Sequence, residues 1–308
     1  MEAASVQAGT SAKRRSRDLS ERRLAAYMVS PSVLLIVLVA AYPIAYAVWL
    51  SLHEYSRFRA GVSRWMEPHI FANYTEALKN DEFRQAIVNT FVFTFFSVGL
   101  ELIIGLGMAL AMHAAFRGQG LLRTVVLVPW AVLTVVTAIM WRTIFDPTLG
   151  IVNAALGTDI VWLGETPYAM FVMIIADVWK TAPFMALLIL AGLQVIPGEI
   201  YEAAKVDGAT MWQRFRKITL PLLAPAILVA LIFRTLDALR IFDLPFVLTK
   251  GQNNTNTMSL EAYQTFTANN ILGAGAAMAI ITFIIVMLVS FAYIRFVGGN
   301  IRGLADET

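Results

Sequence analysis

Seven ionisable residues interrupt otherwise apolar stretches of this sequence, and their spacing suggests two charged helix faces. Asp177 and Lys180 lie three residues apart, which is near enough to pair along one face of a helix. Four others repeat every three residues: Arg234, Asp237, Arg240 and Asp243. The seventh, Glu101, is a lone carboxylate in an earlier apolar stretch. An ionisable group at membrane depth costs roughly 2.5–3.5 kcal/mol, so each must face a bundle interior, a partner or a water-filled path.

Two interpretations of these charges stay open from their positions. They can line a path for a polar solute, or they can form ion pairs that hold helices or subunits together without touching solute. For Glu101 we favour the second interpretation, in which the carboxylate is hydrogen-bonded or paired with a neighbouring subunit.

Other recognisable chemistry is absent from the sequence. There is no Cys, and the three histidines, His53, His69 and His113, are dispersed. The sequence contains no H-E-x-x-H, G-x-S-x-G or D-x-D motif, and no Gly-Lys dipeptide that a nucleotide-binding P-loop requires. We therefore predict no catalytic residue, no metal site and no bound cofactor, and the scattered basic residues do not predict nucleic-acid binding.

The composition indicates a chain that lies mostly in a bilayer. Hydrophobic residues make up 58% and charged residues 15%, against roughly 45–50% and 25% in soluble domains. A helix needs about 20 apolar residues to cross. Six apolar stretches qualify, and we expect an all-α membrane protein with helices over about 24–52, 86–113, 124–145, 168–193, 220–248 and 271–293.

The distribution of positive charge predicts the orientation. If the N-terminus is cytoplasmic, the inside segments hold fourteen Lys and Arg residues and the outside segments six. Positive residues stay on the cytoplasmic side, so we expect both termini there, in a multi-pass protein of the cell membrane. Residues 1–23 form a basic arm, 24–84 the first span with an outer segment, and 296–308 a cytoplasmic tail. The run after the arm is too long for the core of a signal peptide.

The cytoplasmic stretch from Pro197 to Pro221 is the most informative segment. Pro197 suits a helix start, and Asp207 with Gly208 supplies a helix stop that tolerates a left-handed backbone. In the helical turn that follows, Trp212 and Phe215 can face the membrane while neighbouring basic residues meet water and lipid headgroups. The pattern predicts two short helices that project from the bilayer.

This stretch resembles the signature loop of the binding-protein-dependent ABC importer permeases, which reads E-A-A, three residues, G, nine residues, I, any residue, L-P. Every fixed position is filled here, by Glu202, Ala203, Ala204, Gly208, Ile218, Leu220 and Pro221. Asp207 and Ala209 complete the D-G-A common among sugar permeases. The resemblance implies that Glu202 to Ala209 couple the chain to a separate ATPase, and it covers about residues 85–295, the usual permease core.

Within that family the chain is most similar to the branch of maltose and trehalose permeases. The resemblance implies a disaccharide, trehalose, as the imported solute. By position the resemblance places sugar contacts on Asp177, Thr181, Phe184, Arg234, Asp237, Ala238 and Ile241. Lys180 lies on the same polar face as these residues. The side chains at these positions differ from those of maltose permeases. Where many sugar permeases have a G-G-P turn, this chain has Lys250 to Asn254, so its outer loop can differ in its contacts.

The resemblance also implies the partners. A second permease, two ATP-binding subunits that carry ATP and Mg, and an extracytoplasmic sugar-binding protein would complete the transporter. Two other classes remain as alternatives: an ion-coupled secondary transporter that uses Glu101, Asp177 or Asp237, and a membrane-embedded glycosyl or acyl transferase. The filled signature argues against the first, and the missing catalytic motifs leave the second without support.

Charge reversal at Glu202, or a bulky residue in place of Gly208, should uncouple ATP hydrolysis from transport while the chain still inserts in the membrane. Solute uptake by membranes that carry each variant, compared with their ATPase activity, measures this. Normal uptake would contradict the coupling assignment.

Overall fold

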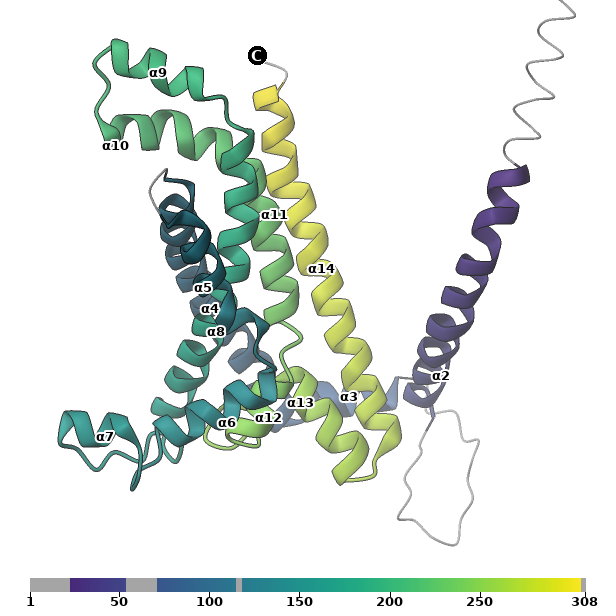
Figure 1. Ribbon diagram of the computed structural model, residues 1–308. Helices are drawn as coiled ribbons and strands as arrows, with labels where there is room; N and C mark the ends of the chain where they lie inside the picture. Colours follow the sequence, from purple (N-terminus) through teal and green to yellow (C-terminus); the bar gives the residue numbers. More distant parts are fainter. Residues whose placement is uncertain (1–22, 54–70, 115–117, 306–308) are drawn as a thin grey trace, which may run out of the picture. The chain divides into compact units, whose positions relative to one another are not determined.

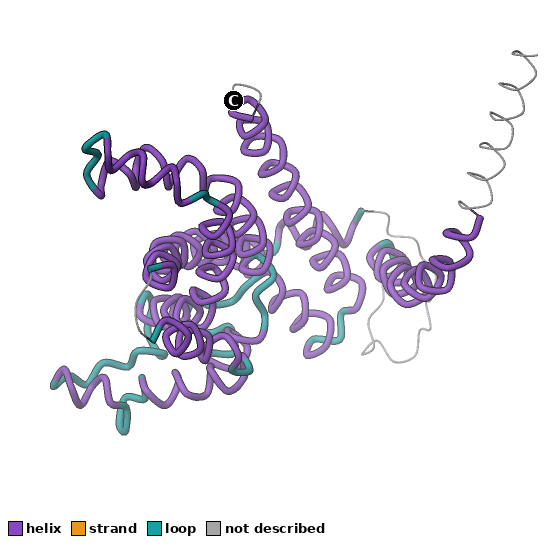
Figure 2. Tube along the Cα trace, turned by 45° about the horizontal axis from the view of Figure 1, so that its top comes forward, coloured by secondary structure: helices purple, strands orange, loops and turns teal. Residues whose placement is uncertain are grey.

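The computed structural model describes residues 23–53, 71–114 and 118–305, and all regular elements in these ranges are helices (Figure 2). The predicted all-α fold is therefore confirmed. Most of the predicted basic arm, much of the predicted outer segment after the first span, and residues 306–308 lie outside the described ranges. The chain forms two compact units, residues 1–50 and 51–308.

The first span runs from Arg23 to Ser51 and has a mean hydropathy of 2.4. A π-helical turn, η1 (Val37–Ala41), interrupts it, and the helix continues as α2 (Tyr42–Ser51). Pro43 has no N–H to bond the carbonyl one turn back, and the π-turn lies directly ahead of it. The span agrees with the uncharged run predicted over residues 24–52.

The second unit carries the remaining helices (Figure 1). They are α3 (Ala72–Lys79), α4 (Asp81–His113), α5 (Gln119–Ala131), α6 (Thr134–Ile144), α7 (Ile151–Leu156), α8 (Tyr168–Val195), α9 (Gly198–Val206), α10 (Met211–Arg214), η2 (Phe215–Thr219), α11 (Leu220–Ala238), α12 (Asp243–Leu248), α13 (Met258–Tyr263), η3 (Gln264–Ala268) and α14 (Leu272–Ala305). Over the described residues, five helices are long and apolar enough to span a membrane, and six if α5 and α6 form one broken span.

The core of the second unit lies where α4, α8 and α11 meet. Its fully buried side chains include Phe93 of α4, Met185 and Ile189 of α8, and Leu223 of α11. Helix α8 has 61% of its most apolar window buried, more than any other span, so it is the central helix. A smaller cluster joins α14 to α3 and α13.

The third predicted span, residues 124–145, is not one straight helix. Helices α5 and α6 are bent by 89° at Val132 and Leu133, which both have extended backbone angles. Pro129 precedes the break and removes one N–H from the helical ladder. Lys180 of α8 donates to the carbonyl of Val132 over 2.7 Å, so the freed end of α5 receives a cation where the helix dipole is negative.

The fifth predicted span, residues 220–248, is wrong at its C-terminal end. Helix α11 begins at Leu220, where it continues α10 and η2, but it ends at Ala238, and a separate helix α12 follows. Pro245 lies in the first turn of α12, where a missing N–H is tolerated, but it could not continue a longer helix. Helices α12 and α13 lie at the end of this unit opposite α9 and α10 (Figure 1).

The loop over Lys250 to Asn254, which the sequence predicts on the outer side, makes contacts of its own. Asn253 and Asn254 adopt positive φ angles, which Asn tolerates better than most residues. The Asn253 side chain donates to the carbonyl of Leu163 over 2.8 Å, and Gln264 donates to the carbonyl of Lys250 over 3.0 Å. The loop is thereby attached to the segment before α8 and to η3.

Gly192 permits the close approach of α8 and α11. A methyl group there would overlap the Ala226 Cβ and lie 3.0 Å from Leu223 Cδ1. Ala226 has no rotamer that could move away, so we expect Gly192→Ala to cost about 1–3 kcal/mol of stability. The midpoint of thermal unfolding in detergent measures this loss.

Gly107→Ala in α4 is the matched control, because its Cβ would meet no atom within 4 Å. Loss of backbone freedom in the unfolded chain should leave that variant unchanged or slightly more stable. Equal midpoints for the two variants would contradict the tight packing at Gly192.

Candidate functional site

A buried arginine joins the three central helices. Arg234 of α11 is 2% exposed, and its Nε and Nη2 atoms lie 2.5 and 2.8 Å from the two carboxylate oxygens of Glu101 in α4, which is 0% exposed. Nη2 also lies 3.0 Å from Asp177 Oδ2 of α8, and Nη1 lies 2.6 Å from Asp237 Oδ2. We call Arg234, Glu101, Asp177 and Asp237 the charge cluster.

Two hydroxyl groups add hydrogen bonds to the charge cluster. Ser97 Oγ lies 2.8 Å from Glu101 Oε1 and 2.6 Å from Asp177 Oδ2. Thr181 Oγ1 lies 2.7 Å from Glu101 Oε1. Each hydroxyl carries one proton, so Ser97 donates to one of the two carboxylates at a time. A buried charge is tolerated when it is paired and hydrogen-bonded, and the ion pairs with Arg234 supply most of that compensation here. Ser97 was missed by sequence reasoning, although a hydroxyl one helical turn before Glu101 was a usable signal.

The interpretation of Glu101 as a hydrogen-bonded or paired carboxylate agrees with the structure, in which its ion-pair partner is Arg234 of the same chain. Bidentate contact between guanidinium and carboxylate fixes direction as well as distance. The registers of α4 and α11 are therefore tied to one another at this point.

The predicted pairing of Asp177 with Lys180 is not observed. Asp177 contacts Arg234 instead, and within the described residues Lys180 forms no salt bridge. Lys180 Nζ donates to the carbonyl of Val132 over 2.7 Å and lies 3.5 Å from that of Trp130. Its cation therefore stabilises the break between α5 and α6, a contact that depends on two helices distant in sequence.

A polar cleft of about 160 Å³ opens beside the charge cluster. Seven of the predicted sugar-path residues line it: Asp177, Lys180, Thr181, Arg234, Asp237, Ala238 and Ile241. The Asp237 side chain is 70% exposed, so this carboxylate brings the charge of the buried cluster to the surface of the cleft. Phe184 does not line the cleft, and its ring stacks on Trp130 with centroids 5.7 Å apart.

The cleft also includes residues at and beyond the end of α11. Arg240, Phe242 and Asp243 line it, and Arg240 Nε donates to the carbonyl of Leu236 over 3.0 Å. The predicted row of charges thus continues past the helix, but Arg240 and Asp243 form no ion pair in the described part of the chain. Cations, carboxylates and a ring meet in one cleft, a combination suited to a solute rich in hydroxyl groups.

The predicted signature segment forms a helical hairpin at the other end of the unit (Figure 1). Pro197 is the N-cap of α9, and Gly208 has φ 77, the left-handed conformation predicted for the turn. Glu202, Ala203 and Asp207 are exposed while Ala204 is buried. The exposed side chains are free to contact another subunit, and Ala204 packs inward.

The second arm of this hairpin differs from the prediction. Instead of a short separate helix, α10 continues through η2 into α11 without a break. Thr210 and Gln213 form a capping box at its start, with Gln213 N 3.3 Å from Thr210 Oγ1. The T-x-x-Q spacing was a missed signal for this start.

A family model described as the binding-protein-dependent transport system inner membrane component matches residues 102–302. The chain belongs to this family. It is 40% identical over 285 residues to the trehalose transport system permease protein SugA of Mycobacterium tuberculosis, with 92% of each chain covered. It is 41% identical over 282 residues to the trehalose/maltose transport system permease protein MalF of Thermococcus litoralis, with 89% of this chain and 94% of that protein covered.

The fold is also similar to a solved structure. A chain of a bacterial ABC transporter involved in the import of the acidic polysaccharide alginate superposes with a TM-score of 0.78 at 21% identity. The match covers 92% of this chain and 98% of that chain. The protein is thus a multi-pass permease subunit of an ABC importer that works with a binding protein, and it is not an enzyme. The secondary-transporter and transferase alternatives are not favoured.

In this permease, Arg234→Met should leave Glu101 buried without its cation, which costs about 3–5 kcal/mol. We expect a lower midpoint of thermal unfolding and a lower yield from membranes. Adding Glu101→Gln should recover part of the loss, because the uncompensated charge is removed.

Arg240→Gln is the control, since Arg240 is exposed and contacts a carbonyl of its own segment. A double variant no more stable than Arg234→Met alone would argue against Glu101 as the principal partner of Arg234.

Proposed function

We propose that this permease forms half of the translocation path of an ATP-driven disaccharide importer, with trehalose as its solute. The observation that carries the proposal is the polar cleft beside the charge cluster, in a chain whose relatives SugA and MalF are named for trehalose and maltose transport. Both relatives align over about nine tenths of the chain.

The side chains of the cleft suit a disaccharide without net charge. Sugar hydroxyls both donate and accept hydrogen bonds, so they can pair with the exposed carboxylate of Asp237 and with the cations of Lys180 and Arg240. Phe242 adds a ring beside these groups. The buried part of the cluster holds Asp237 in place through Arg234, which limits its rotamers before the sugar arrives.

We further propose that Glu202 to Ala209 dock into a separate ATPase, and that the hairpin and both termini face the cytoplasm. The basic residues of the hairpin, Lys205, Arg214, Arg216 and Lys217, support this orientation. A second permease, two ATP-binding subunits that hold ATP and Mg, and an extracytoplasmic binding protein complete the transporter.

The continuous helix from α10 through η2 to α11 supports a direct route of coupling. This helix carries the second arm of the hairpin at one end and Arg234 with Asp237 at the other. Tyr201 of α9 and Thr219 of η2 are hydrogen-bonded at 3.1 Å, so the two arms of the hairpin are tied together. Movement of the hairpin by the ATPase would therefore shift the helix that presents Asp237 to the sugar.

The proposal is tested with the purified transporter in liposomes, by measuring ATP hydrolysis and uptake with a panel of sugars delivered by the binding protein. We expect trehalose to stimulate both activities. Asp237→Asn should raise the trehalose concentration for half-maximal uptake on the order of tenfold, since a hydrogen bond to a charged group contributes about 1.5–3 kcal/mol.

Asp159→Asn, an exposed carboxylate outside the cleft, is the matched control. Stimulation by a different sugar would replace trehalose but keep the importer. Uptake driven by an ion gradient without ATP would overturn the proposal.

A further inference from the structure

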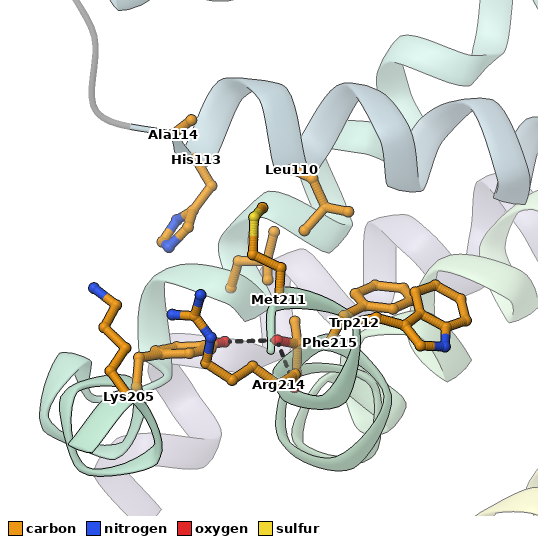
Figure 3. A pocket seen from close by; sticks show the side chains of 11 residues that line it. Leu110, His113, Ala114, Lys205, Met211, Trp212, Arg214 and Phe215 are labelled. Carbon is orange, nitrogen blue, oxygen red and sulfur yellow. Dashed lines mark hydrogen bonds between the residues drawn. The ribbon is translucent and has the colours of Figure 1, made fainter. Parts of the chain in front are cut away.

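A second and larger pocket lies beneath the hairpin, far from the polar cleft. It has a volume of about 1000 Å³ and is bounded by the end of α4, by α8 and by both arms of the hairpin (Figure 3). We call it the hairpin pocket. None of the residues that line it belongs to the charge cluster, and of the segment proposed to dock into the ATPase, Glu202 to Ala209, Lys205 alone is among the lining residues.

One wall of the hairpin pocket is apolar and open to its surroundings. Met211 is 80% exposed and Trp212 is 66% exposed, and the Trp212 ring stacks on Phe215 with centroids 5.5 Å apart. Leu110 of α4 faces them across the pocket (Figure 3). Large apolar side chains exposed in this way at the end of a membrane span are suited to contact with acyl chains.

The opposite side of the hairpin pocket carries three basic groups from three helices. His113 ends α4, Lys205 lies in α9 and Arg214 in α10, and their nitrogen atoms face the same space (Figure 3). No carboxylate lines the pocket, and none of the three is in an ion pair within the described ranges. Arg214 Nε is buried and has no hydrogen-bond partner among the described residues.

The ligand that matches these walls has an anionic head and an apolar tail. A soluble anion would leave the Met211, Trp212 and Leu110 wall uncovered, and a neutral lipid would leave the basic groups without a counter-ion. The position of the pocket along the spans also agrees with a lipid ligand, because His113 and Met211 are the end residues of two spans, where lipid headgroups lie. Basic pockets between membrane helices are suited to acidic headgroups.

We propose that the hairpin pocket binds one acidic phospholipid, with its phosphate against Lys205 and Arg214 and an acyl chain along Leu110, Met211 and Trp212. The lipid would connect the end of α4 to the hairpin. Since the hairpin is continuous with α11, a bound acidic lipid would brace the segment through which coupling is proposed to pass.

The intact transporter in nanodiscs of phosphatidylcholine with one tenth phosphatidylglycerol provides the test. Native mass spectrometry and lipid extraction measure how much phosphatidylglycerol stays bound after transfer to detergent. We expect the double variant Lys205→Gln, Arg214→Gln to retain on the order of tenfold less than the parent, since two charge-assisted contacts are lost.

The matched control is Arg216→Gln, Lys217→Gln, which removes the same charge from the same segment at exposed positions that do not line the pocket. It should retain phosphatidylglycerol as the parent does. Leu110→Trp, which fills the apolar wall without changing charge, should also release the lipid.

Two results would overturn the proposal. Equal loss from both charge variants would show a general attraction of the basic hairpin to acidic bilayers. Unchanged lipid retention together with loss of the ATPase subunits from the Lys205, Arg214 variant would show that the pocket is a protein interface. Either outcome leaves the sugar proposal intact, because trehalose-stimulated uptake by the parent transporter is measured separately.

Discussion

The structure of this permease depends on one buried guanidinium. Arg234 is almost fully enclosed, and its charge is tolerated because carboxylates from α4, α8 and its own helix surround it. In a membrane the alternative is a charge exposed to lipid, which is costly. The three helices are therefore held in one register, and the polar cleft exists where the last carboxylate of this arrangement, Asp237, emerges from the core.

One continuous helix connects the signature hairpin with the polar cleft. Helix α11 begins in the hairpin that carries the family signature and ends at the cleft, without a break in between. Gly208 turns the hairpin, the capping box at Thr210 begins its second arm, and Arg234 anchors the far end. A continuous helix held at both ends is the route through which we propose that coupling passes, and the hairpin pocket lies beside its first turns.

Much of this arrangement was predictable from the sequence. Apolar runs between charged segments indicated the spans, since length and hydropathy together decide whether a helix can cross a bilayer. The spacing of Glu202, Ala203, Ala204 and Gly208 indicated the hairpin and the family, and the left-handed turn followed from Gly208 itself. Charges in apolar helices need polar surroundings, and Asp177, Lys180, Arg234 and Asp237 do line one cleft. The family resemblance, not the charge pattern, suggested Thr181, Ala238 and Ile241 beside them, and it also suggested Phe184, which lies outside the cleft.

What the sequence by itself determined, then, is which segments enter the membrane, where the signature hairpin turns and which side chains need polar surroundings. The tertiary structure alone decided their partners: Asp177 contacts Arg234 while Lys180 binds the freed carbonyl of Val132. It also decided that α5 and α6 bend apart and that α11 stops at Ala238. The physical reason is that spacing along one helix defines which neighbours are possible, whereas the energy of a buried charge depends on atoms that other helices bring to it.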